Sequence, residues 1–172
     1  MKTMSTIESC ALPSNALLDA YAKAGAYTDC FTTHISRRVA LDQFVEAFYT
    51  TGLFKLERLI LKWAVSHPST DVQARQLAAD KIDSFAAWRV EDRSENQLLM
   101  CDFRNRTRSW FMVESEGSPG IAMTRLYFGS AVVPQKHSST GKSAMGIIFR
   151  SLLGFHRLYS VALLRAARSR LN

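Results

Sequence analysis

Long apolar runs are missing from this sequence of 172 residues. No stretch reaches 18 consecutive apolar residues, so we expect no transmembrane helix. The nearest approach, residues 144–164, is interrupted by Arg150, His156 and Arg157. The first 15 residues also lack the apolar core of a secretory signal peptide, and we therefore expect a cytoplasmic protein.

Cysteine, glycine and proline are all scarce. The three cysteines, Cys10, Cys30 and Cys101, lie far apart without a CxxC pair, so the sequence predicts neither a disulfide framework nor a structural zinc site. The four histidines show no metal-ligand spacing, and we expect no metal and no cofactor. Eight glycines and four prolines leave little material for a long linker. We expect residues 1–26 to form an N-terminal leader with a short helix, and residues 27–172 to form a single domain.

Acidic residues are scarce in the second part of the chain. Residues 103–172 carry 11 basic and 2 acidic side chains, whereas residues 1–102 carry 11 basic and 13 acidic ones. A basic surface attracts nucleic acid or an anionic membrane, but it is more often an ordinary solvated surface. No nucleic-acid-binding motif accompanies the basic residues, so we do not expect a nucleic acid partner. Peripheral contact with a membrane surface stays open as an alternative.

Apolar side chains at helical spacing predict five helices. They cover residues 16–24, 43–50, 54–65, 70–81 and 144–171. Asp42 is the expected N-cap of the second helix, and Thr70 with Gln73 has the spacing of a capping box at the start of the fourth. On the last helix, an apolar stripe that includes Leu158 and Leu163 predicts the buried face.

Alternating apolar and polar residues predict five strands. They cover residues 27–39, 85–93, 97–104, 108–116 and 121–133. The last four are joined by segments of turn length, which predicts antiparallel hairpins. Gly129, inside the longest of these strands, is expected to form a bulge that curves the sheet. The predicted fold class is therefore α+β: a curved antiparallel sheet packed against a long C-terminal helix, with helices inserted after the first strand.

Five short motifs follow this order of elements. They are YTDCF at residues 27–31, the strand with Trp88, WFMVE at residues 110–114, the strand with Thr124, and FHRLY at residues 155–159. The order resembles the helix-grip fold of the START, polyketide-cyclase and birch-pollen-allergen superfamily, also called SRPBCC, and the motifs are similar to those of an uncharacterised bacterial domain family of that fold. The resemblance covers about residues 27–170. It implies binding of apolar or amphipathic small molecules, with cyclase or hydrolase chemistry in some members.

A curved sheet and one long helix cannot touch everywhere, so we expect an apolar cavity between them. Trp88, Trp110, Tyr127 and Tyr159 are predicted to line it, with His156 at its mouth or in its wall. An imidazole there can act as an acid or base near pH 7, although such a histidine is more often a structural hydrogen-bond partner. The leading hypothesis is a protein that holds a small apolar or amphipathic ligand between sheet and helix.

Three charged residues, Asp102, Arg104 and Arg125, lie in otherwise apolar strands. If they face the cavity, Asp102 has to pair with Arg104 or Arg125, and the group would bind a carboxylate or hydroxyl of the ligand. If they face solvent, the pair is a surface ion pair of small energetic value. These side chains and His156 also leave open an enzyme of the same fold that polarises a ligand carbonyl.

The segment Gly141-Lys142-Ser143 matches the end of a phosphate-binding loop. The full motif needs a further glycine five positions before Gly141, and that position is Lys136. We therefore predict that this loop binds no nucleotide. Three hypotheses remain: a ligand-binding protein, an enzyme of the same fold, and a basic protein that binds a membrane surface or nucleic acid.

Overall fold

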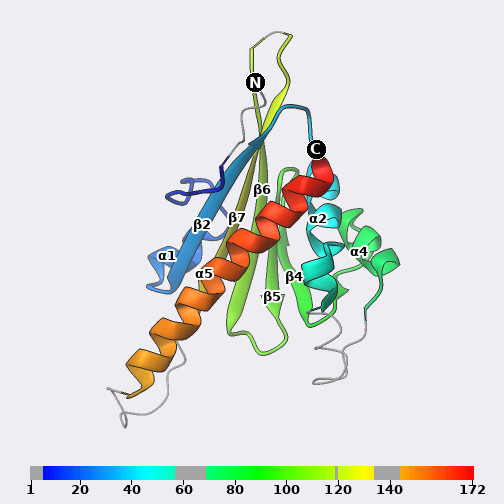
Figure 1. Ribbon diagram of the computed structural model, residues 1–172. Helices are drawn as coiled ribbons and strands as arrows, with labels where there is room; N and C mark the ends of the chain where they lie inside the picture. The colour runs from blue at the N-terminus through cyan, green and yellow to red at the C-terminus, as the bar shows by residue number, and fades with distance from the viewer. Residues whose placement is uncertain (1–5, 57–68, 119, 134–143) are drawn as a thin grey trace.

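A seven-stranded antiparallel sheet forms the centre of the structure, a computed structural model that describes residues 6–56, 69–118, 120–133 and 144–172. In chain order the elements are β1 (Glu8–Ser9), α1 (Asp19–Lys23), β2 (Tyr27–Ile35), α2 (Leu41–Tyr49), α4 (Asp71–Ala78), β3 (Ser84–Phe85), β4 (Trp88–Arg93), β5 (Gln97–Asp102), β6 (Thr107–Glu116), β7 (Met123–Val132) and α5 (Ala144–Leu171). The strands are ordered β1-β2-β7-β6-β5-β4-β3 in the sheet. Because α5 crosses one face of this curved sheet (Figure 1), the predicted α+β class is confirmed.

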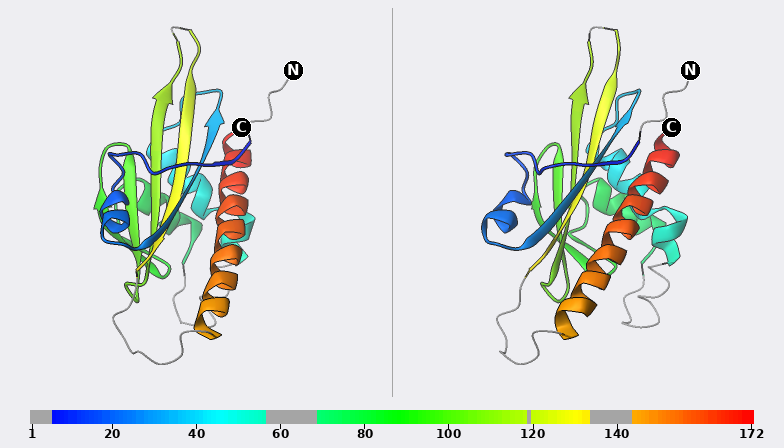
Figure 2. Two further views of the ribbon diagram at one scale, coloured as in Figure 1. Left: turned by 90° about the vertical axis from the view of Figure 1, so that its left-hand side faces the viewer. Right: turned by 60° about the vertical axis from the view of Figure 1, so that its left-hand side comes forward.

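Both faces of the sheet are buried, each by a different part of the chain. Since successive side chains in a strand point to opposite faces, Phe111 and Phe128 lie on one face, and Trp110 and Tyr127 on the other. The first face packs against α2 and α5. The second is covered by the segment that carries α1, where Leu18 is fully buried. Figure 2 shows α5 and α1 on opposite sides of the sheet.

Aromatic rings fill much of the space between α2 and the sheet. The ring centroid of Phe48, in α2, lies 4.8 Å from that of Phe111 and 4.6 Å from that of Phe128. The next residue, Tyr49, lies 5.5 Å from Phe111 and 5.0 Å from Phe85 by the same measure. Each ring of this kind buries about 150–250 Å², so the cluster contributes strongly to the core.

The N-terminal caps of two helices differ in how well the sequence predicts them. The capping box of α4 is present: Thr70 Oγ1 accepts a hydrogen bond from Gln73 N at 3.2 Å, and Gln73 Oε1 accepts one from Thr70 N at 2.9 Å. The predicted cap of α2 is wrong, because the N-cap is Ala40, whose N–H donates to Gln43 Oε1 at 3.1 Å. Asp42 lies instead in the first turn, where a negative charge interacts favourably with the helix dipole.

Gly129 does not form the predicted bulge. It pairs regularly with Trp110, and the irregularity of the sheet lies in β4, between Val90 and Asp92. The glycine is needed for space: a Cβ atom there would lie 2.9 Å from the backbone oxygen of Asp29, 3.0 Å from Trp110 Cε3 and 3.1 Å from Leu18 Cδ2. A side chain at this position would therefore displace the residues that cover the second face of the sheet.

The buried face of α5 also differs from the prediction. Ser160, Leu163, Leu164 and Ala167 are buried at helical spacing, whereas Leu158 is 73% exposed. The sequence places apolar residues around most of this helix, so their spacing alone does not determine which side meets the sheet. The buried side of α5 is determined by its packing against α2, β2 and β7.

Candidate functional site

A small cavity of about 170 Å³ lies between the sheet and α5. The strands contribute Trp88, Thr107, Ser109 and Phe128, α5 contributes His156, Tyr159, Ser160 and Leu163, and α2 with the residues after it contributes Phe48, Tyr49 and Phe54. Aromatic and aliphatic side chains thus make up most of the wall, and hydroxyl groups and one imidazole provide its polar part. This combination of apolar walls and few polar groups is typical of small-molecule sites.

The face of the sheet that meets α5 changes from apolar to polar beside this cavity. Two successive rows across β2, β7 and β6 are Phe31–Phe128–Phe111 and Asp29–Ser130–Ser109. Asp29 is 8% exposed and Ser130 is 1% exposed, although both are polar. Buried polar groups require hydrogen-bond partners, and direct pairing of the strands places these two residues side by side.

A chain of hydrogen bonds joins the buried Asp29 to the histidine of the cavity. Asp29 Oδ1 accepts from Ser130 Oγ at 2.5 Å and from Ser130 N at 3.1 Å. Ser130 Oγ lies 2.7 Å from His156 Nε2. Since an ionised carboxylate only accepts hydrogen bonds, the Ser130 hydroxyl donates to Asp29 and accepts from His156 Nε2–H. The chain therefore places a hydrogen on His156 Nε2.

This arrangement differs from that of a serine hydrolase. In the catalytic triad the histidine lies between the carboxylate and the serine, whereas here the serine lies between the other two. Ser130 is buried and its hydroxyl donates a hydrogen bond to Asp29, so it is not placed as a nucleophile. The half-buried His156 is the member of the chain that lines the cavity, and its imidazole is the group able to exchange a proton with a bound molecule.

The structure brings together three of the eight predicted site residues. Trp88, His156 and Tyr159 all line the cavity between the sheet and α5. Trp110 and Tyr127 do not, because they point to the opposite face of the sheet, and their predicted placement in this cavity is wrong. Trp110 Nε1 donates instead to Gln97 Oε1 at 2.9 Å.

Tyr127 has a polar partner of its own on the second face. Its hydroxyl donates to Glu114 Oε2 at 2.9 Å. Burial, together with this bond to Glu114, raises the pKa of Tyr127 to about 12. Its phenol thus remains protonated well above the range in which an ordinary tyrosine ionises.

Asp102, Arg104 and Arg125 do not line the cavity, and the side chains of the two arginines do not pair with Asp102; only the Arg104 backbone N–H reaches its carboxylate, at 3.4 Å from Oδ2. The Asp102 carboxylate accepts from the backbone N–H groups of Arg106 at 2.6 Å and Thr107 at 2.9 Å, so it stabilises the turn between β5 and β6. The exposed Arg104 places its guanidinium 5.1 Å from the Phe103 ring centroid. Arg125 forms an ion pair with Glu116 at 3.4 Å. The expected pairing of Asp102 with Arg104 or Arg125 is therefore wrong, because the turn backbone occupies the carboxylate.

Sequence analysis missed Asp29 and Ser130. A signal was present, since each is a polar residue at a position whose neighbours two residues along the same strand, Phe31 and Phe128, belong to the buried core. The periodicity of one strand does not identify the partner strand, however, and β2 and β7 are far apart in the chain. Their pairing became apparent only from the sheet register.

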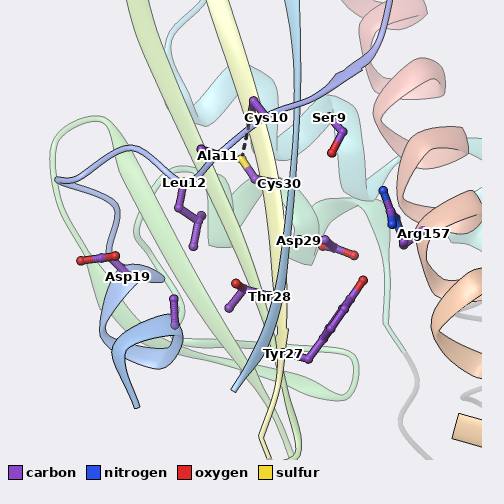
Figure 3. A pocket seen from close by; sticks show the side chains of 11 residues that line it. Ser9, Cys10, Ala11, Leu12, Asp19, Tyr27, Thr28, Asp29, Cys30 and Arg157 are labelled. Carbon is purple, nitrogen blue, oxygen red and sulfur yellow. Dashed lines mark hydrogen bonds between the residues drawn. The ribbon is translucent and has the colours of Figure 1, made fainter. Parts of the chain in front are cut away.

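A second, larger and less enclosed hollow of about 420 Å³ lies beside the edge of β2 (Figure 3). Cys10 and Cys30 lie on its α1 side, and Tyr27 and Asp29 point toward Arg157 of α5. Burial and the neighbouring Asp29 carboxylate raise the pKa of the Tyr27 phenol. The smaller cavity is the stronger candidate for a ligand site because it is more enclosed and is lined by the imidazole.

Comparison of the chain with protein-family models, curated proteins and solved structures finds no match. Within the described residues, no helix has both the length and the apolar character to cross a membrane. In the same part of the chain, no group of three or more acidic, histidine or cysteine side chains is arranged to hold a metal ion. The loop with Gly141-Lys142-Ser143 and most of the predicted helix at residues 54–65 lie outside the described residues.

Proposed function

We propose that this protein binds a small amphipathic molecule in the cavity between the sheet and α5, as the helix-grip superfamily does. The observation that carries the proposal is the cavity itself, with its mainly apolar wall and a single imidazole held by the Ser130–Asp29 pair. An apolar ring would contact Phe48, Phe128 and Tyr159. A hydroxyl or carbonyl group of the same molecule would hydrogen-bond to His156 or a neighbouring hydroxyl.

The volume limits the size of the ligand. A protein cavity of about 150 Å³ accommodates benzene, and drug-sized ligands occupy sites of about 300–1,000 Å³. The present cavity, at about 170 Å³, therefore fits a molecule with one ring and a short polar substituent. Benzyl alcohol has this size and chemistry and is a suitable probe.

The test uses two tryptophans on opposite faces of the sheet. Trp88 lines the cavity, whereas Trp110 is buried on the face covered by α1. Benzyl alcohol is expected to change the tryptophan fluorescence of the native protein in a saturable manner. Because the chain has a third tryptophan, Trp63, outside the described residues, both variants also carry Trp63→Phe. The response should be lost in Trp88→Phe and retained in Trp110→Phe, with circular dichroism confirming that both variants fold. A response that survives Trp88→Phe and disappears in Trp110→Phe would place the ligand on the wrong face and overturn the proposal.

A second candidate function is acid–base chemistry on the bound molecule. The hydrogen-bond chain Asp29–Ser130–His156 supports it, because the chain fixes the orientation of the imidazole toward the cavity. The test is the hydrolysis of 4-nitrophenyl acetate, an ester with one ring. General acid–base catalysis contributes about 10²–10⁴-fold, so His156→Gln should lower the rate by about 100-fold. His34→Gln, which removes a histidine paired with Glu116 on the sheet, is the matched control; equal rates in both variants would exclude this candidate.

A further inference from the structure

We propose that Cys10 and Cys30 form a redox-active dithiol pair, which a peroxide converts into a disulfide that joins the N-terminal segment to β2. This inference is independent of the cavity between the sheet and α5, because the two thiols lie on the other side of β2 (Figure 3).

The pairing of β1 with β2 brings the two sulfur atoms together. Glu8 pairs with Thr32 and Ser9 with Phe31, and Cys10 N donates to Cys30 O at 3.0 Å. The two Sγ atoms share a hydrogen bond at 3.2 Å. A disulfide has an S–S length of about 2.0 Å, so the atoms have to approach by only about 1.2 Å. Since β1 is a two-residue edge strand, this small adjustment at Cys10 disturbs few hydrogen bonds of the sheet.

The two thiols also differ in exposure and in pKa, and disulfide formation requires one thiol that ionises more readily than the other. Cys10 is half-buried, and both thiols line the hollow beside β2, through which a small oxidant reaches them. The hydrogen bond that Cys10 shares with Cys30 lowers the pKa of the Cys10 thiol, and the positive charge of Arg125 acts in the same direction. The same bond and burial raise the pKa of Cys30. Cys10 is therefore the nucleophile that reacts first, and Cys30 is the thiol that completes the bond.

The reaction balances with hydrogen peroxide as the oxidant. The Cys10 thiolate attacks one oxygen of the peroxide, the O–O bond breaks, and a sulfenic acid forms while hydroxide leaves. Cys30 then attacks the Cys10 sulfur, the S–S bond forms, and the second hydroxide leaves. With the protons from both thiols, the products are one disulfide and two molecules of water. A dithiol such as dithiothreitol reverses the change by thiol–disulfide exchange.

Cys101 provides an internal control. Its thiol is buried and lies 3.1 Å from Asn105 Oδ1, and burial raises its pKa. The only sulfur–sulfur hydrogen bond among the described residues joins Cys10 and Cys30. The proposal thus predicts that one particular pair of the three thiols reacts.

The experiment titrates the reduced, full-length protein with hydrogen peroxide. The thiol count after denaturation should fall from three to one, the intact mass should fall by about 2 Da, and a non-reducing peptide map should show a Cys10–Cys30 linkage. The variant Cys101→Ser should form the same disulfide at the same rate. In Cys30→Ser, a sulfenic acid at Cys10 should accumulate and react with dimedone.

The linkage also has a predicted effect on stability. It closes a loop between residues 20 positions apart, so the midpoint of thermal unfolding should rise on the order of 5–10 °C and return to its original value with dithiothreitol. A constant count of three thiols in the folded wild-type protein, a disulfide that includes Cys101, or a linkage only between chains would each overturn the proposal. Because these measurements use the wild-type protein, they do not depend on the folding of any variant.

Discussion

At the scale of single residues, the chemistry of the cavity depends on contacts between distant parts of the chain. Asp29 and Ser130 are 101 positions apart, and Ser130 is 26 positions before His156. His156, which the sequence singles out as a candidate site residue, lines the cavity from the middle of α5. It did not predict the hydrogen-bond chain, because no local pattern states which strand pairs with which.

Gly129 gives a test of packing at one residue. We expect Gly129→Ala to lower the free energy of unfolding by about 1–3 kcal/mol, because the added methyl group would press against the backbone oxygen of Asp29, the Trp110 ring and the Leu18 side chain. Chemical denaturation measures the change.

The matched control for this substitution is Gly154→Ala in α5. Among the described residues, and apart from its chain neighbours and the backbone of its own helix, a Cβ atom at Gly154 meets no atom within 4 Å, and alanine favours a helix over glycine by about 1 kcal/mol. The control should therefore be neutral or stabilising. Equal effects of the two substitutions would show that the contacts of Trp110 and Leu18 with Gly129 are not as tight as described.

Tyr127 makes stability depend on pH in the alkaline range. Its pKa is about 12 in the folded protein and about 10 in the unfolded chain, so its contribution is complete below pH 10 and is lost as the pH rises toward 12. At pH 11 the loss amounts to about 1 kcal/mol. Urea unfolding at pH 9 and pH 11 should show that Tyr127→Phe loses less stability than the wild type over this interval. An identical loss in both proteins would contradict the burial and hydrogen bond assigned to this phenol.

At the scale of helices and strands, the sequence predicts the elements better than their contacts. The strands β4 to β7 and the long helix α5 lie close to the predicted ranges, since turns and periodicity are local signals. The face on which Trp110 lies was not predictable, because both faces of β6 are apolar and alternation does not identify the face that meets α5. In α5, likewise, apolar residues on several sides of the helix do not identify the buried side, and Leu158, which was predicted to be buried, is exposed.

The start of α4 tests a contact that the sequence did predict. Thr70→Ala removes the side-chain acceptor of the Gln73 N–H and should destabilise the protein by about 1 kcal/mol. Asp42→Ala in the first turn of α2 is the comparison, because Asp42 does not occupy the cap position and its interaction with the helix dipole contributes about 0.3–1 kcal/mol. Denaturation midpoints of both variants show which substitution destabilises the protein more. A larger loss of stability for Asp42→Ala than for Thr70→Ala would contradict the assignment of the caps.

At the scale of the whole molecule, the sheet separates two regions with different chemistry. The cavity with His156 lies between the sheet and α5, and the Cys10–Cys30 pair lies under the N-terminal segment on the other face. The sequence suggested a cavity because a curved sheet and one long helix cannot touch everywhere. It did not show that α2 would fill most of this space with aromatic rings, which leaves a volume of only about 170 Å³.

The most direct measurement is the detection of intermolecular nuclear Overhauser effects between bound benzyl alcohol and the isotope-labelled protein. If the ligand occupies the cavity between the sheet and α5, its ring protons will show contacts with the side chains of Trp88, Phe128, Tyr159 and Leu163. Saturating benzyl alcohol that shows no contact with these residues, or contacts only Trp110 on the opposite face, would contradict the proposed site.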